Sequence, residues 1–247
     1  MHKTYTSPGG TKYSLYVDML SRPHLLIAGA TGSGKSVALN GLIYTALLRF
    51  PDEVKLILID LKRVELAEYR NLPHTVCYAD SAESAVSALE TAVQICESRY
   101  AEMQKQRVKL YQGADLYVVI DEFADLMTTA ARRVKPPIQR IGQIGRAAKV
   151  HAIVATQTPI ARVLPTEIKC NFDARLGLRT RSAQDSRNIL GYSGLETLPQ
   201  YGQGVYMTPQ GDTLYNIPYI TDTERSRVVQ TWEAQTKKKS IFSFWRA

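Results

Sequence analysis

The sequence predicts an α/β fold with a mostly parallel central sheet, helices on both of its faces and a C-terminal β-hairpin. Three observations lead to this prediction. Short apolar, β-branched runs are typical of strands buried on both faces. Longer segments with apolar residues at helical spacing alternate with them, which favours strand–helix–strand units. The length of 247 residues suits one large α/β domain.

The predicted elements follow one another along nearly the whole chain. Tyr13, Leu15 and Val17 alternate with polar residues, which predicts a short strand before the first buried one. We expect strands over residues 24–28, 54–59, 116–120, 150–155 and 174–178. Helices are expected over residues 35–50, 63–70, 82–110, 122–129, 137–148, 166–171, 183–190 and 222–236. Two β-rich runs within residues 204–220 meet at a Pro-Gln-Gly-Asp turn, which predicts the hairpin.

Composition limits the cellular compartment and the classes of binding partner that we expect. The formal charge is +8, which fits binding to nucleic acid and fits equally a solvated basic surface. Cys77, Cys96 and Cys170 are far apart, which indicates a reducing compartment and neither a disulfide framework nor a zinc site. No apolar run reaches the roughly 18–20 residues that span a bilayer. We therefore expect a cytoplasmic protein without direct membrane insertion.

A complete phosphate-binding motif lies between the strand at 24–28 and the following helix. Residues 29–36 match G-x-x-x-x-G-K-[ST] in full. In this motif backbone N–H groups and the helix N-terminus hold the phosphates of a nucleotide. Lys35 is expected to reach the β- and γ-phosphates, and Ser36 to be a ligand of Mg²⁺. The predicted nucleotide-binding residues are Gly29, Ala30, Thr31, Gly32, Ser33, Gly34, Lys35, Ser36 and Val37.

Two carboxylates, Asp121 and Glu122, directly follow the apolar strand at 116–120. An acidic residue at a strand end is needed to hold Mg²⁺ in such a site, and Asp121 fits this role. Glu122 fits a base that polarises the water attacking the γ-phosphate, which favours ATP hydrolysis. The alternative is an acidic turn after a strand.

Polar residues at two further places complete the candidate site. Gln157 follows the strand at 150–155 and is placed to sense the γ-phosphate, unless it is simply a strand-end turn residue. In ring-shaped NTPases an arginine of the neighbouring subunit commonly completes the site. Arg146, Arg175 and Arg187 are candidates, and spacing alone does not choose among them.

Taken in order, the motifs resemble the motor domain of the FtsK/SpoIIIE family of DNA translocases, within the FtsK–HerA group. The resemblance covers residues 12–234 or thereabouts. It extends to the block around Asp60 and Glu65, to Gly145-Arg146-Ala147-Ala148, to Asp185-Ser186-Arg187 and to Gly202-Gln203-Gly204. Leu61 and Thr158 depart from the pattern, because the family usually has Pro and Arg there.

The resemblance implies a RecA-like ATPase that assembles as a homo-oligomer, a hexameric ring, and moves along double-stranded DNA using ATP and Mg²⁺. By position Arg146 matches the family's arginine finger, with Arg187 as second choice. The implied organisation is an extension over 1–23 packed on the core, an ATPase domain over 24–236 and a flexible basic–aromatic tail over 237–247.

Three functions remain as hypotheses. The first is a DNA translocase for transfer or segregation, encoded by a mobile element and working with a membrane-bound or DNA-processing partner. The second is a protein-export ATPase of the type VII secretion kind, whose motor domains share these blocks. The third is a scaffold that binds ATP and turns little of it over, against which the intact Lys35, Asp121 and Glu122 argue.

Overall fold

One eight-stranded sheet organises the molecule. The computed structural model describes the backbone of residues 14–244 and the side chains of residues 14–234. The strands run in the order β3-β2-β4-β5-β1-β6-β7-β8. Their bounds are β1 His24–Ala28, β2 Val54–Ile59, β3 Thr75–Ala79, β4 Asp115–Ile120, β5 Val150–Thr156, β6 Ala174–Leu178, β7 Gln203–Thr208 and β8 Gly211–Asn216. The pairings from β3 to β6 are parallel, and β7 and β8 form an antiparallel hairpin beside β6.

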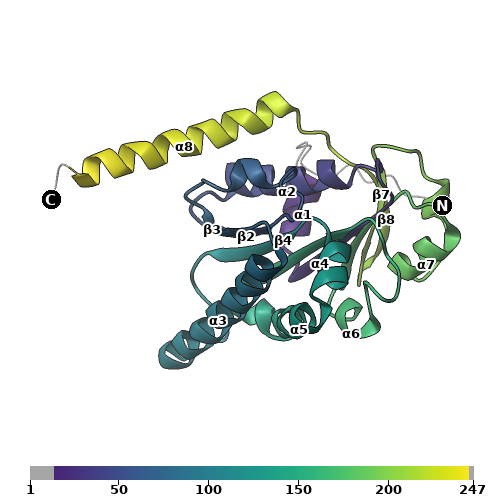
Figure 1. Ribbon diagram of the computed structural model, residues 1–247, viewed down its shortest axis with the longest axis horizontal. Coiled ribbons are helices and arrows are strands. Elements are labelled where there is room, and N and C mark those ends of the chain that lie inside the picture. The colour runs from purple at the N-terminus through teal and green to yellow at the C-terminus, as the bar shows by residue number, and fades with distance from the viewer. Residues whose placement is uncertain (1–13, 245–247) are drawn as a thin grey trace.

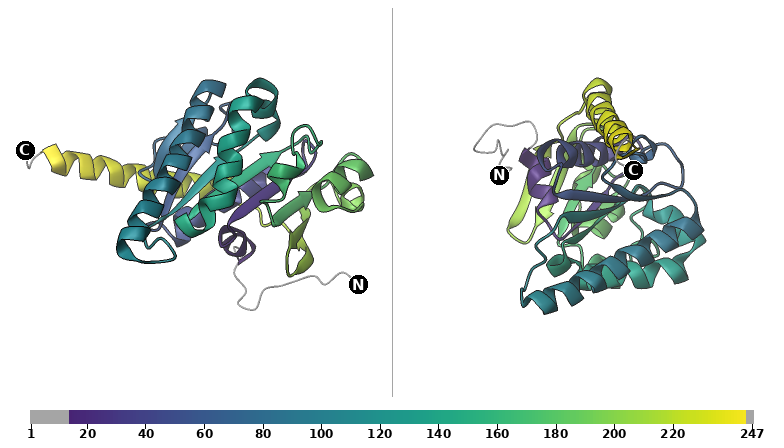
Figure 2. Two further views of the ribbon diagram at one scale, coloured as in Figure 1. Left: turned by 90° about the horizontal axis from the view of Figure 1, so that it is seen from below. Right: turned by 90° about the vertical axis from the view of Figure 1, so that its left-hand side faces the viewer.

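Helices cover both faces of the sheet, as Figures 1 and 2 show. Residues of α1 and α2 pack on one face in one apolar cluster, while α3, α4, α5 and α6 pack on the other face in a second cluster. The helices are α1 Ser14–Leu20, α2 Lys35–Arg49, η1 Ala67–Tyr69, α3 Ala82–Gln106, α4 Phe123–Thr129, α5 Ala131–Ala148, α6 Thr166–Lys169, α7 Ala183–Leu190, η2 Leu195–Thr197 and α8 Asp222–Phe244. The predicted α/β fold, with its parallel sheet and C-terminal hairpin, is confirmed.

The prediction of a strand around Leu15 and Val17 is wrong. Residues 14–20 form helix α1, and residues 1–13 lie outside the described part of the chain. The buried residues of this segment are Leu15, Tyr16, Met19 and Leu20. They recur at helical spacing and pack against α2, so the burial pattern of the folded molecule selects a helix.

Two other elements differ from the sequence-based expectation. Strand β3 was not predicted, because its five residues follow a proline and only Ala79 is buried. Helix α5 begins at Ala131, six residues before the expected start, and contains Pro136 and Pro137. Proline inside a helix destabilises it by about 3 kcal/mol, so the sequence predicted that the helix would begin only at the second of these prolines. Burial of Val134 and Ile138 in the second cluster offsets that cost.

Helices η1 and α3 are shorter than predicted, and α8 is longer. The expected helix over 63–70 is reduced to the 3₁₀ turn η1. Helix α3 starts with a capping box formed by Ser81 and Ser84, and ends where Arg107 adopts a left-handed conformation with φ 57°.

Helix α8 reaches Phe244 and projects beyond the body of the molecule (Figure 1). Its first half is anchored, since the Trp232 ring packs edge-on against His74 at 4.7 Å between centroids. The predicted tail over 237–247 therefore begins within α8, and its flexibility stays a prediction. None of the helices in the described residues has the length and apolar character needed to cross a bilayer.

Candidate nucleotide-binding site

The predicted site residues converge at the carboxyl edge of the parallel strands. The phosphate loop follows β1, Asp121 follows β4 and Gln157 follows β5. Strand β5 lies between β1 and β4 and pairs with both. Ligands of open α/β sheets bind at this edge. The strand order thus places Gln157 between the loop and the two carboxylates.

The glycines of the loop are required by its backbone. Gly32 and Gly34 have φ values of 74° and 100°, which favour glycine strongly. A Cβ at Gly29 would lie 2.6 Å from Ser33 Oγ and 2.7 Å from Leu178 Cβ, so a side chain does not fit there. Gly34 is the N-cap of α2 and provides no side-chain hydrogen bond to its first turn. The backbone N–H groups at the start of α2 are therefore positioned to bind an anion.

Lys35 connects the loop to both carboxylates. Its Nζ donates to the Asp121 carbonyl oxygen at 2.6 Å and to Asp121 Oδ1 at 2.7 Å. Glu122 Oε2 lies 4.0 Å from the same nitrogen. All three side chains are buried, so the charges face one another with little water between them. The sequence analysis assigned Lys35 to contact with the phosphates. In this structure its ammonium group is paired with Asp121 instead.

Three hydrogen-bond donors hold the Glu122 carboxylate. Its carboxylate accepts hydrogen bonds from Thr156 Oγ1 at 2.7 Å and from the Gln157 backbone N–H at 3.0 Å. It also caps helix α4 by accepting from the Ala124 N–H, while Lys35 lies nearby. Thr156 was missed by the sequence analysis, although its position next to Gln157 at the strand end could have indicated it.

Gln157 connects Glu122 with the phosphate loop. Its backbone N–H binds Glu122, and its side-chain Oε1 accepts from Thr31 Oγ1 at 2.6 Å. Arg181 Nη2 lies 3.5 Å from the same threonine hydroxyl. A cavity of about 110 Å³ adjoins this contact and is lined by Ala30, Gln157, Thr158, Pro159, Thr180, Arg181 and Asp185. Arg181 is a second residue that sequence reasoning missed.

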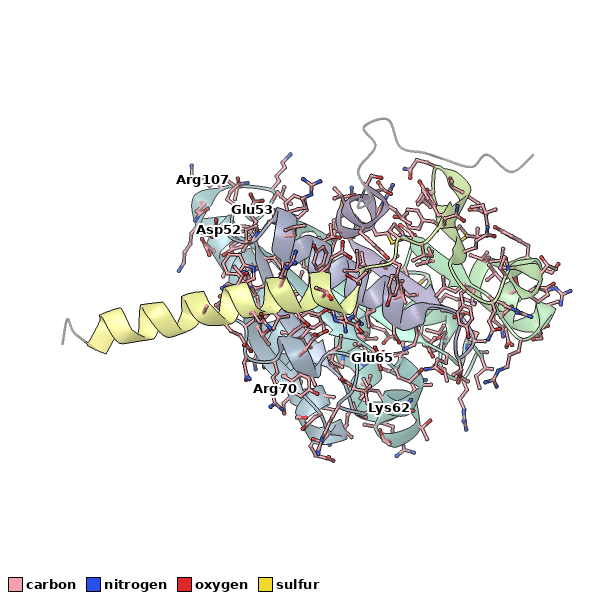
Figure 3. All side chains as sticks on the ribbon, turned by 90° about the horizontal axis from the view of Figure 1, so that it is seen from above. Asp52, Glu53, Lys62, Glu65, Arg70 and Arg107 are labelled. Carbon is pink, nitrogen blue, oxygen red and sulfur yellow. The ribbon has the colours of Figure 1, made fainter. Side chains whose placement is uncertain are left out.

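Glu65 reaches the start of α2. Its Oε1 accepts a hydrogen bond from Ser36 Oγ at 2.7 Å. Figure 3 labels Glu65 and Lys62, which come from the segment between β2 and η1. Asp60 anchors that segment because its Oδ2 accepts from the Leu66 N–H at 2.9 Å.

Ser36 and Asp121, the predicted metal ligands, supply oxygen atoms, which is the chemistry that Mg²⁺ prefers. Within the described residues no group of three or more His, Cys, Asp or Glu side chains could hold a metal by itself. Mg²⁺ is usually bound by one or two carboxylates together with phosphate oxygens. The residues present therefore fit a magnesium ion that arrives with a nucleotide.

The three candidate arginines have different surroundings. Arg175 donates to the carbonyl oxygens of Phe172, Ile189 and Lys169, so its guanidinium is engaged within this chain. Arg146 and Arg187 are exposed. Arg146 lies in the last turn of α5, just before β5 begins, and hence at the edge of the sheet opposite its own phosphate loop.

The fold and the site define a P-loop ATPase with a sheet of the RecA-like order. The family model described as "FtsK/SpoIIIE family" matches residues 6–115 and 109–161, and the chain belongs to that family.

Relatives named DNA translocase FtsK include the protein of Helicobacter pylori (strain ATCC 700392 / 26695), which is 37% identical over 235 residues. That match covers 88% of this chain and 27% of the relative. The protein of Chlorobaculum tepidum is 39% identical over 237 residues, covering 86% of this chain and 29% of the relative. The chain thus spans less than a third of the length of these relatives.

Solved structures share the fold. The pCW3 conjugation coupling protein TcpA, in a monomer form with ATPγS, superposes with a TM-score of 0.76 at 22% identity, over 87% of this chain and 66% of that one. The Thermomonospora curvata EccC (ATPases 2 and 3) in complex with a signal sequence peptide gives 0.66 at 25% identity, over 83% and 38% of the two chains.

Proposed function

We propose that this chain is the motor of a double-stranded DNA translocase, which hydrolyses ATP with Mg²⁺ and works as a homo-oligomeric ring, a hexamer. The observation that carries the proposal is the buried cluster of Lys35, Asp121 and Glu122 beside a complete phosphate loop. It provides a phosphate-binding cation, a metal-binding acid and a base. The curated relatives named DNA translocase support DNA as the partner.

In the proposed reaction each residue has a defined task. Loop N–H groups and Lys35 would hold the phosphates, and Ser36 and Asp121 would hold a magnesium ion, which would supply neutralisation of the phosphate charge. Glu122 orients and deprotonates the attacking water, and its hydrogen bonds to Thr156 and Gln157 fix it for this role. Gln157 would transmit changes at the γ-phosphate to Glu122, because its backbone N–H binds Glu122 and its side chain accepts from Thr31 of the loop. Arg146, or Arg187 as second choice, completes the site of the next subunit.

The test is ATP hydrolysis with and without long duplex DNA over a range of salt concentrations. Hydrolysis should rise with DNA at low salt and lose this stimulation as salt increases, because phosphate contacts release counterions. Glu122→Gln serves as the control for contaminating activity. Absence of stimulation at every salt concentration would contradict the proposal.

A protein-export motor is the second candidate, and the likeness to EccC at 25% identity supports it. The two candidate motors differ in the polymer that they would move, which is duplex DNA for the first and a polypeptide for the second. Binding of a substrate peptide without binding of duplex DNA would favour export. DNA binding by itself would not distinguish DNA transfer from segregation. A role in conjugative transfer is supported only by the name of TcpA, a conjugation coupling protein with which this chain shares its fold.

A further inference from the structure

The Ser36 hydroxyl has one proton, and its destination decides what the oxygen can bind. A hydroxyl that coordinates a cation through a lone pair has to donate its proton elsewhere. Here it donates to Glu65 Oε1 at 2.7 Å. We propose that Glu65 is a positioning residue that turns the Ser36 lone pairs toward the magnesium ion of a bound nucleotide. This proposal rests on the proposed function, which supplies the magnesium nucleotide.

The position of Glu65 is itself fixed by a hydrogen-bonded network. Asn40 Nδ2 donates to the Ser36 carbonyl oxygen at 3.0 Å and lies 3.5 Å from Glu65 Oε2. Tyr69 donates its hydroxyl proton to Asn40 Oδ1 at 2.8 Å, which settles the orientation of that amide. Tyr69 is fully buried, and burial raises the pKa of its hydroxyl, so it remains a donor. The network directs one Glu65 oxygen to Ser36.

The obvious alternative acceptor is engaged elsewhere. In this structure Asp121 Oδ1 accepts from Lys35 at 2.7 Å, and the Ser36 hydroxyl donates to Glu65. Glu65 comes instead from the segment after β2, which Asp60 ties down through Leu66 N–H. A residue 29 positions away in sequence therefore controls the hydroxyl of the loop.

Two conservative substitutions separate acceptor geometry from charge. Glu65→Gln keeps an acceptor oxygen at the same reach and removes the charge. Glu65→Asp keeps the charge and withdraws the acceptor by one methylene. The measurement is the Mg²⁺ concentration that half-maximally tightens binding of ATPγS, compared with binding in EDTA. Glu65→Asp should raise that concentration about tenfold, as loss of a residue orienting a metal ligand typically does, and Glu65→Gln by clearly less.

Controls make each outcome decisive. Glu97→Gln removes an exposed carboxylate of α3 that pairs with Arg140, away from this network, and should leave the Mg²⁺ requirement unchanged. In a Ser36→Ala background, Glu65→Asp should have no further effect on the Mg²⁺ requirement. Equal affinities in EDTA show that the loop remains folded.

The reverse order, with Glu65→Gln more harmful than Glu65→Asp, would overturn the proposal, as would no change in either variant. A wild-type chain that binds no nucleotide would refute the proposed function itself, which is a distinct result.

Discussion

At the scale of single residues, Glu122 shows how a carboxylate is prepared for one task. Thr156 and the Gln157 N–H hold it, and it starts helix α4. Such a residue has little freedom to take another role. Lys35 Nζ lies 4.0 Å from Glu122 Oε2 and 2.7 Å from Asp121 Oδ1, so Asp121 is the carboxylate that pairs with the lysine.

Glu122→Gln is predicted to bind ATP and to hydrolyse it at least about a hundredfold more slowly, because general-base catalysis typically contributes that much. Nucleotide affinity and turnover should be measured on the same preparation. Lys35→Ala is the contrasting variant and should lose affinity for ATP, since Lys35 is the cation of the loop. Hydrolysis by Glu122→Gln at the wild-type rate would mean that the base is another residue.

His24 is predicted to make stability depend on pH. It is buried, and its Nδ1 accepts from the Ala152 N–H at 3.0 Å. Burial lowers the pKa of His24 from 6.5 to about 4, with a smaller contribution from His151. Between those values the unfolded chain binds the proton and the folded chain does not. The stabilisation is therefore complete above pH 6.5 and is lost as pH falls toward 4, by about 3 kcal/mol.

Urea unfolding at pH 7.5, 5.5 and 4.5 measures this effect. His24→Asn is the matched variant, because an amide oxygen can accept from Ala152 without titrating. The difference between wild type and variant should shrink as pH falls, since other groups titrate equally in both. A pH-independent difference would show that protonation of His24 does not limit stability.

Sequence reasoning found the residues whose roles follow from adjacency and missed those brought in by folding. The phosphate loop and Asp121-Glu122 are contiguous motifs at strand ends, so their positions could be predicted. Glu65 and Arg181 meet Ser36 and Thr31 only because separate segments converge at one edge of the sheet. Periodicity contains no information on such contacts between distant segments.

At the scale of elements, the docking of α1 on α2 depends on a missing side chain. A Cβ at Gly41 would overlap the ring of Tyr16, which is fully buried and donates its hydroxyl proton to the Pro218 carbonyl oxygen at 2.7 Å. Glycine inside a helix normally weakens it by about 1 kcal/mol relative to alanine. Here the close approach of two helices reverses that preference.

Gly41→Ala is therefore predicted to lower the free energy of unfolding by about 1–3 kcal/mol, the usual cost of overpacking. Denaturant unfolding monitored by far-UV circular dichroism measures it. In a Tyr16→Leu background the same substitution should become neutral or stabilising, because the overlap is gone. Stabilisation in the wild-type background would show that α1 is free to move away.

The errors in element prediction share a physical origin. For α1 the alternating residues suggested a strand. In the folded molecule its apolar residues pack against α2, and residues at helical spacing are the ones that reach that surface. For β3 no strong pattern exists, since parallel pairing with β2 is what orders it. The central strands β1, β2, β4 and β5 were found because they are apolar on both faces and need no partner to be recognised.

At the scale of the whole molecule, the opposite placement of Arg146 and the phosphate loop suits a composite site. One subunit would supply the loop and the next would supply the arginine. Arg175 is removed from consideration because it binds three carbonyl oxygens of its own chain. Arg146 and Arg187 stay exposed and can be compared directly.

Mixing two inactive variants tests this arrangement. Arg146→Ala and Lys35→Ala are each predicted to lack ATP hydrolysis. In a random equimolar ring about a quarter of the interfaces would join an intact loop to an intact arginine, so hydrolysis should return in part. The same experiment with Arg187→Ala is the comparison. No recovery with either arginine would place the finger elsewhere or within the same subunit.

The ion pair of Lys35 and Asp121 has a consequence for ligand choice. In the resting site this cation is paired with Asp121 and lies beside Glu122, so it presents no free positive charge to an anion such as inorganic phosphate. A magnesium–nucleotide complex brings both signs at once, so the lysine can turn to phosphate as the aspartate turns to the metal. Under the proposed function, entry of the magnesium–nucleotide complex would be an exchange of partners, and the site would favour that complex over free phosphate or free Mg²⁺.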